Sequence, residues 1–128
     1  MNILLDACTL IWLTQEPERL SENSRTIIED SDNELMLSHV SVWEMLSKIQ
    51  TGKFSFPVPL RKWLKDQQSV WDFRYLNIGL EHLLRVEEIE RHHSDPFDRL
   101  LVTQAIVENI GILTPDPWIA RYPVQVIW

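Results

Sequence analysis

Residues 2–13 read NILLDACTLIWL, a short apolar run that ends at an aspartate and continues into a second apolar run. The first run, residues 2–5, predicts a buried strand that ends at Asp6, and residues 7–13 predict a brief helix. The same order of short apolar strand and helix recurs along the chain. This pattern predicts an α/β fold, in which helices form layers over a central, mostly parallel sheet.

The remaining elements follow from the same signals outward from this stretch. Ser38 is placed to cap the helix predicted over residues 39–52, and Gly52 is placed to end it. Helices are predicted from Ser21 or Asn23 to about Asp30, over 39–52, 60–70 and 80–90, and from Pro96 to Gly111. Strands are predicted at 34–37, 73–78 and 111–114, with a possible edge strand at 123–128. No repeat, low-complexity tract or linker divides the sequence, so a single domain over residues 1–128 is expected.

The composition is that of a compact globular chain. Hydrophobic residues make up 45% of the 128 residues, with six Trp and only three Gly. Trp12, Trp63 and Trp71 are expected in the core, with a partner groove as the alternative. No basic leader and no long apolar run occurs at the start, so a cytoplasmic protein without membrane contact is expected.

Charge and cysteine content exclude several functions. The net charge is −7, whereas a protein that holds nucleic acid by charge alone is normally basic. A nucleic-acid substrate would therefore require cations over the acidic residues or a local basic patch. The single cysteine excludes an internal disulfide and any multi-cysteine zinc site. Cys8 lies in an apolar run, which favours a buried free thiol over a nucleophile.

Two aspartates follow predicted strands. Asp6 comes directly after residues 2–5, and Asp116 comes shortly after residues 111–114. In an open parallel sheet, sites form just beyond the carboxyl ends of the strands. Each aspartate alone is equally well explained as the cap of the next helix. The two together, with an acidic helix start elsewhere, indicate a shared site.

That acidic helix start is HHSDPFDRLLVTQA, residues 92–105. Asp95 suits the N-cap and Pro96 the first helical position. Asp98 lies on the same line of the helix as Leu101, Val102, Ala105 and Asn109. It therefore points along a packed face, where a carboxylate needs a metal ion or hydrogen-bond partners.

The helix over residues 39–52 gives no such signal for its acid. Its predicted inward face is made by Val42, Met45, Leu46 and Ile49. Glu44 lies opposite this face, where it forms an ordinary i, i+4 pair with Lys48. The pattern alone therefore predicts a solvated Glu44.

Four segments resemble, in this order, the PIN-domain ribonucleases, and more narrowly the VapC-type toxins of bacterial toxin–antitoxin pairs. The segments are ILLDACTLIWL (3–13), SHVSVWEMLSKIQTGK (38–53), HHSDPFDRLLVTQA (92–105) and GILTPDPWIARYPVQVIW (111–128). The HHxDPFDRLLxxQA stretch is distinctive, and the WExxxK block stands in the right place. The resemblance extends from the first predicted strand to the last.

The resemblance implies a PIN-like three-layer α/β/α fold and a Mg²⁺- or Mn²⁺-dependent endoribonuclease. Such a toxin cleaves RNA phosphodiesters, is inhibited by a cognate antitoxin and is expected to form a homodimer. The family's catalytic and metal-binding acids correspond to Asp6, Glu44, Asp98 and Asp116, with Asp95 as an accessory acid. For Glu44, the role that the resemblance implies replaces the solvated residue that the pattern alone predicts.

The sequence departs from the family where the first acid is often followed by a small hydroxyl residue, because Ala7 stands there. Whether Thr9 or Thr114 supplies that hydroxyl stays open. His92 and His93 are adjacent and cannot easily aim both rings at one ion. They are expected to pack at the helix entry, with a contact to RNA as the alternative.

A basic stretch supplies the candidate RNA contacts. Between residues 48 and 74 there are six Lys or Arg against two Asp. The candidates are Lys48, Arg61, Lys62 and Lys65, and a merely solvated helix face is the alternative.

Two other functions compete with the ribonuclease hypothesis. A Mg²⁺-dependent phosphoryl-accepting domain would require a lysine after a late strand, but no lysine follows Lys65. A catalytically inactive PIN-like protein-binding module would not require the complete acidic set.

Overall fold

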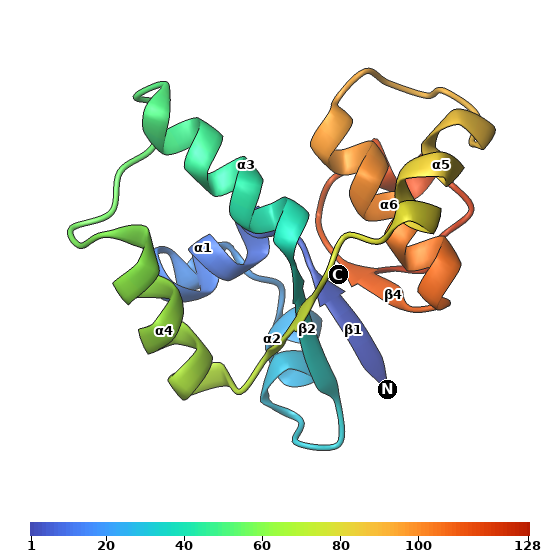
Figure 1. Cartoon of the computed structure of the whole chain (residues 1–128). Helices are drawn as coiled ribbons and strands as arrows, with labels where there is room; N and C mark the ends of the chain where they lie inside the picture. The colour runs from blue at the N-terminus through green and yellow to red at the C-terminus, as the bar shows by residue number, and fades with distance from the viewer.

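The computed structural model describes all of residues 1–128, which form one five-stranded sheet with helices on both faces (Figure 1). The strands are β1 (Asn2–Leu5), β2 (Glu34–Ser38), β3 (Arg74–Leu76), β4 (Gly111–Leu113) and β5 (Val126–Ile127). The helices are α1 (Ala7–Gln15), α2 (Glu22–Glu29), α3 (His39–Gln50), α4 (Leu60–Trp71), α5 (Leu80–Glu88) and α6 (Pro96–Glu108). Two short 3₁₀ helices, η1 (Pro17–Arg19) and η2 (Ile119–Arg121), were not predicted.

The sheet is parallel throughout, in the strand order β3-β2-β1-β4-β5. Its central strand, β1, pairs with β2 on one side and with β4 on the other. The chain therefore builds outward from β1 in both directions, and the strand order reverses beside it. A crevice at the carboxyl end of such a switch point is where open α/β sheets bind ligands.

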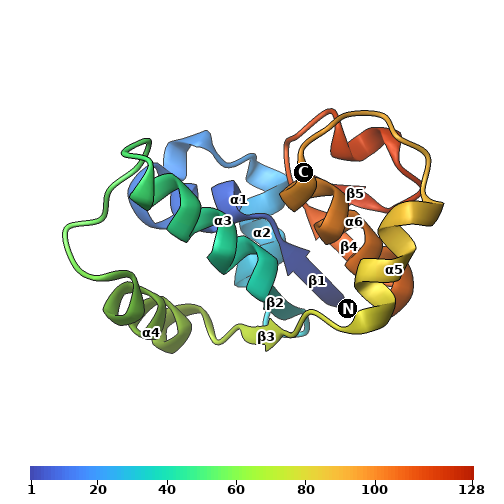
Figure 2. The same cartoon turned by 45° about the horizontal axis from the view of Figure 1, so that its top comes forward.

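Two hydrophobic clusters cover the two faces of the sheet. Ile3 and Leu5 of β1 belong to the cluster that contains α1, α2 and α4, whereas Leu4 belongs to the cluster built on α6. Alternation along β1 thus places neighbouring residues on opposite faces. Figures 1 and 2 show α5 and α6 on one side of the sheet and α1, α2 and α4 on the other. This arrangement confirms the predicted three-layer α/β/α fold.

Helix α3 lies where these two layers meet. Its Met45 packs in the first cluster and its Val40 in the second. The side chain of Ser38 accepts a hydrogen bond from the backbone N–H of Val40, which confirms the predicted cap. Gly52 follows the end of α3 with a φ of 74°, a conformation that suits glycine.

The prediction that the last long helix continues to Gly111 was wrong. Helix α6 ends at Glu108, and Asn109 closes it in the left-handed conformation, with φ 54°. Asparagine tolerates this conformation better than other residues with side chains. Gly111 begins β4, in agreement with the strand predicted over 111–114, and an added Cβ there would lie 3.1 Å from Cδ1 of Ile127. Glycine there permits the close approach of β5.

Two of the predicted strands were longer than the strands observed. The strand predicted over 73–78 is β3, which is limited to residues 74–76. The possible edge strand over 123–128 is present as β5, but only residues 126–127 pair with β4. None of the helices combines the length and the apolar character that crossing a membrane requires.

Candidate acidic site

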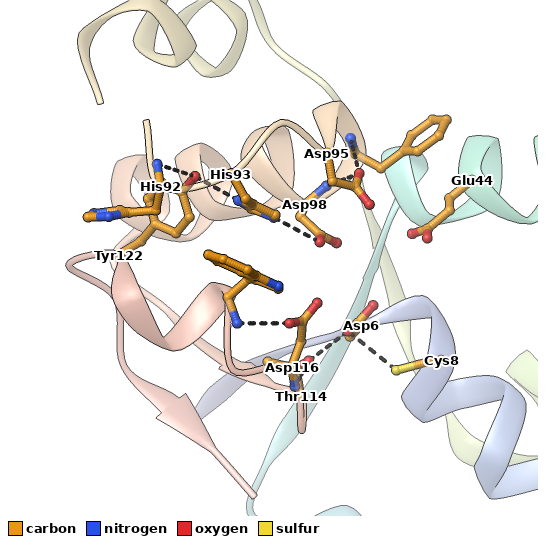
Figure 3. A network of polar contacts seen from close by, with 12 residues as sticks. Asp6, Cys8, Glu44, His92, His93, Asp95, Asp98, Thr114, Asp116 and Tyr122 are labelled. Carbon is orange, nitrogen blue, oxygen red and sulfur yellow. Dashed lines mark hydrogen bonds and ion pairs between the residues drawn. The ribbon is translucent and has the colours of Figure 1, made fainter. Parts of the chain in front are cut away.

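Five acidic side chains converge at the carboxyl end of the sheet (Figure 3). They come from the end of β1, from the segment after β4, from the start of α6 and from α3. They are Asp6, Asp116, Asp95, Asp98 and Glu44. An open pocket of about 670 Å³ is lined in part by Asp95, Asp98 and Asp116. The fold therefore brings together all the acids that the sequence singled out.

Asp6 is buried, with 6% of its surface exposed. Its side chain caps no amide of α1, so helix capping does not explain this residue. Instead Oδ2 accepts hydrogen bonds from the hydroxyl of Thr114, at 2.6 Å, and from the thiol of Cys8, at 3.4 Å. Burial raises the pKa of Asp6, although both of these hydrogen bonds act to lower it.

The residue that supplies a hydroxyl beside the first acid, in place of Ala7, is Thr114. Its hydroxyl reaches Asp6 from the end of β4. The hydroxyl of Thr9 donates to the backbone carbonyl of Leu113, at 2.9 Å, and thereby ties α1 to β4. Of the two threonines, only Thr114 therefore hydrogen-bonds to Asp6.

Cys8 is a free thiol that is partly rather than fully buried. Burial and the neighbouring Asp6 raise its pKa, and its S–H donates to that carboxylate. A nucleophilic cysteine needs the opposite, an electropositive surrounding that stabilises the thiolate. The structure therefore supports the interpretation of Cys8 as an unreactive thiol.

The two acids of the DPFD segment have different surroundings. Oδ1 of Asp95 accepts hydrogen bonds from the backbone N–H groups of Phe97 and Asp98, so Asp95 is the N-cap of α6, as predicted. Asp98 is 8% exposed and makes no capping bond. Burial, followed by repulsion from Asp95, Asp6, Asp116 and Glu44, raises the pKa of Asp98 to about 8. Asp98 is therefore a carboxyl group that lacks compensating positive charge.

Asp116 occupies a turn rather than a helix cap. Its Oδ1 accepts the backbone N–H of Trp118, at 2.9 Å, and its own N–H donates to the hydroxyl of Thr114. Thr114 therefore connects Asp6 and Asp116, because its hydroxyl contacts both residues. This short polar chain holds the ends of β1 and β4 in a fixed relation.

The pattern-based interpretation of Glu44 as a solvated residue was wrong. Its side chain is 13% exposed and pairs with Lys48, at 3.1 Å. Burial raises the pKa of Glu44, with Lys48 acting against it and with Asp6 and Asp95 adding to it. Compared with the prediction, the inward face of α3 is rotated toward Ser41. Ser41 is 2% exposed, whereas Leu46, which was predicted to face inward, is 40% exposed. Ser41 and Glu44 share that face, so the acid enters the site.

His93 packs at the entry of α6, as predicted, and it also contacts the site through Asp98. Its Nε2 lies 3.1 Å from Oδ2 of Asp98, and its Nδ1 lies 2.9 Å from the hydroxyl of Tyr122. The ring of His92 packs edge-on against Tyr122 and lies near Glu90. Sequence spacing could not separate the two histidines, because the rings pack against Tyr122 and Trp118, which belong to a distant part of the chain.

The chemistry of these side chains suits a hard divalent cation better than a soft one. Carboxylate oxygens predominate, and they are the ligands that Mg²⁺ and Mn²⁺ prefer. The raised pKa values of Asp6, Glu44 and Asp98 indicate negative charge that a cation would stabilise. No group of three or more His, Cys, Asp or Glu side chains is placed to chelate an ion directly. Mg²⁺ commonly keeps several waters and takes only one or two carboxylates, so the residues fit such an ion.

The candidate RNA-binding cations do not lie together at the acids. Lys48 is paired with Glu44, and Lys62 on α4 is paired with Asp66, at 3.0 Å. Arg61 and Lys65 line an apolar groove between α3 and α4. Only Lys48 therefore contacts the acidic site.

A family model described as "PIN domain" matches residues 3–124. The chain belongs to the PIN domain family. This match includes all five acids and His93, and the fold of this PIN domain agrees with solved structures. VapBC2 from Rickettsia felis superimposes with a TM-score of 0.70 at 12% identity, covering 99% of this chain and 98% of that chain. FitAcB from Neisseria gonorrhoeae gives a TM-score of 0.61 at 18% identity, covering 98% and 96%.

A curated relative is similar along most of the PIN domain. It is named ribonuclease VapC22, from Mycobacterium tuberculosis (strain ATCC 25618 / H37Rv). The two sequences are 28% identical over 118 residues, which cover 90% of this chain and 87% of the relative.

Proposed function

We propose that the protein is a Mg²⁺- or Mn²⁺-dependent endoribonuclease, the toxin of a bacterial toxin–antitoxin pair. The observation that carries this proposal is the convergence of five carboxyl groups at the switch point of the sheet, with the pKa of Asp98 raised to about 8. Such mutual repulsion is costly unless a cation offsets it. Membership of the PIN domain family and similarity to a relative named a ribonuclease support phosphodiester cleavage as the reaction.

In this proposal the role of each acid in metal binding depends on its position in the site. Asp6 and Asp98, the two most buried acids, hold the ion directly, and Glu44 and Asp116 complete the site directly or through water. A bound ion lowers the pKa of a coordinated water and offsets charge on the phosphate. Thr114 and Cys8 hold the Asp6 carboxylate, Lys48 limits the charge on Glu44, and Asp95 starts the helix that carries Asp98. A cation also lets an acidic pocket approach an anionic backbone.

A cognate antitoxin and a second copy of the chain are the proposed protein partners. The similar solved structures include VapBC2 and FitAB, each bound to a DNA fragment. Large apolar side chains are exposed on α5, where Leu80 is 71%, Leu83 50% and Leu84 53% exposed. The groove between α3 and α4 is also mainly apolar. Exposed apolar surface of this kind is typical of protein interfaces. Co-purification with the product of a neighbouring gene, and the mass of the purified protein, test these two partners.

A ribonuclease assay on purified protein tests the proposed reaction. We expect cleavage of single-stranded RNA with Mg²⁺ or Mn²⁺, none with EDTA, and a loss of at least about 100-fold in Asp6→Asn and Asp98→Asn. Asp66→Asn is the matched control, because Asp66 is an exposed acid on α4 that pairs only with Lys62. Full activity in Asp6→Asn or Asp98→Asn would overturn the assignment. A protein that binds its partner but never cleaves RNA would be a binding module instead.

A further inference from the structure

His93 is a nearly buried histidine that the proposed function does not use. Its side chain is 11% exposed and lies between α6 and the segment around η2. One ring nitrogen faces Oδ2 of Asp98, at 3.1 Å, and the other faces the hydroxyl of Tyr122, at 2.9 Å. Figure 3 shows His92, Tyr122, His93 and Asp98 as one continuous chain of contacts. Both ring nitrogens of His93 therefore have a polar partner, one on α6 and one after η2.

The direction of every bond in the chain follows once Asp98 is ionised, as it would be when it holds a metal ion. An ionised carboxylate can only accept, so Nε2 of a neutral His93 then carries the proton. A neutral imidazole then has its lone pair on Nδ1, which accepts from the hydroxyl of Tyr122. The oxygen of Tyr122 in turn accepts the backbone N–H of His92, at 3.3 Å. Each donor in the chain thus faces an acceptor, and no two donors or two acceptors face each other.

Packing holds the ring in this orientation. The ring of His93 is stacked on Trp118, with an interplanar angle of 1° and centroids 5.7 Å apart. The backbone N–H of Trp118 donates to Asp116, and Tyr122 is only 3% exposed. Residues 116–122 therefore include one candidate metal ligand, Asp116, and reach a second one, Asp98, through His93.

We propose that His93 is a positioning residue for the metal centre, in which its Nε2–H fixes Oδ2 of Asp98 and Tyr122 selects the required tautomer. This inference rests on the proposed function, because Asp98 must be a metal ligand for its orientation to matter. Groups that hydrogen-bond to a metal ligand orient it, and removing one typically weakens metal affinity about 10- to 100-fold. The side chain of His92 makes no hydrogen bond in this chain, and only its backbone N–H, which His92→Leu retains, donates to Tyr122.

Metal binding measured without RNA tests the proposal. Isothermal titration with Mn²⁺ should show at least about tenfold weaker binding in His93→Leu than in the native protein. His93→Gln, whose amide N–H can replace Nε2–H, should retain most of the affinity, and Tyr122→Phe should lose part of it. His92→Leu is the matched control and should bind as the native protein does. Equal affinity in His93→Leu and His92→Leu would overturn the proposal.

The tautomer provides a second, independent readout. In Mg²⁺-saturated protein, long-range ¹H–¹⁵N correlation spectra should place the proton of His93 on Nε2, and a proton on Nδ1 would contradict the proposal. This measurement, with His93→Gln and Tyr122→Phe, tests the role of His93 even if His93→Leu does not fold.

The variant Asp98→Asn separates the proposed role of His93 from the proposed metal site. If Asp98→Asn loses Mn²⁺ binding but His93→Leu does not, only the role of His93 is wrong. If Asp98→Asn binds Mn²⁺ normally, both inferences are wrong.

Discussion

The surroundings of Asp98 show how one residue couples folding to function. Burial and four neighbouring acids raise its pKa to about 8, far above the ordinary 3.8 of the unfolded chain. Between these two pH values the native protein holds a proton that the unfolded chain has released. The free energy of unfolding therefore falls as the pH rises across this window. Asp6 and Glu44, whose pKa values are also raised, act in the same direction.

From this sign we predict that the metal-free protein is less stable at pH 9 than at pH 5. Asp98→Asn should flatten the pH profile and stabilise the metal-free protein at pH 9 by at least about 1 kcal/mol, or about 4 °C in Tm. Thermal unfolding in EDTA at several pH values measures this change. Asp66→Asn should leave the profile parallel to the native one, and a parallel profile in Asp98→Asn would contradict the assigned environment.

At the scale of elements, α6 connects the acidic site to the rest of the fold through Gln104. This side chain is fully buried. Its amide N–H donates to the backbone carbonyl of Asn77, and its oxygen accepts the hydroxyl of Ser38, the cap of α3. One glutamine thus fixes α6, which carries Asp98, relative to α3, which carries Glu44.

We predict that Gln104→Leu destabilises the protein by about 2 kcal/mol, because the carbonyl of Asn77 and the hydroxyl of Ser38 lose a buried partner. Urea unfolding measures the change in the free energy of unfolding. Gln50→Leu, at the exposed end of α3, is the matched control and should change stability by less than about 0.5 kcal/mol. A similarly small effect of Gln104→Leu would mean that this hydrogen-bond network contributes nothing to stability.

At the scale of the whole molecule, five acids gather at the carboxyl end of the sheet, and the candidate RNA-binding cations lie mainly on α4. The net charge of −7 opposes RNA binding in general. Figure 2 shows α4 well separated from α5 and α6. In the same view α3, which carries Lys48 and Glu44, lies between α4 and α6, so it stands on a direct path from the cations of α4 to Asp98.

We predict that reversing the charge at Lys62 and Lys65 weakens RNA binding in the Asp98→Asn background. For each phosphate that the protein no longer neutralises, the slope of log K against log [salt] should become shallower by about 0.7 for a single strand. Fluorescence anisotropy with a labelled RNA at several salt concentrations measures the slope. The double variant Arg19→Glu and Arg25→Glu, which lies outside α4, changes the net charge by the same amount and is the control. An unchanged slope would show that α4 presents only a solvated face.

Much of this fold and part of the site are encoded locally. Residues 2–13 predict a buried strand, an acid and a helix because burial and periodicity depend on near neighbours. The cap at Asp95 and the burial of Asp98 follow from positions within one helix. Boundaries were less well determined: Gly111 resembles a helix end, but its role is to admit Ile127 from another strand.

What the sequence determined by itself was the order of elements, the α/β class and the set of acids to consider. Only the tertiary structure decided which face of α3 turns inward, and therefore that Glu44 joins the site. It also joined Thr114 to Asp6 across 108 residues, and Tyr122 to His93 across 29. Periodicity gives the relative angles of side chains on one element, whereas the partner of a buried polar group is set by how separate elements pack.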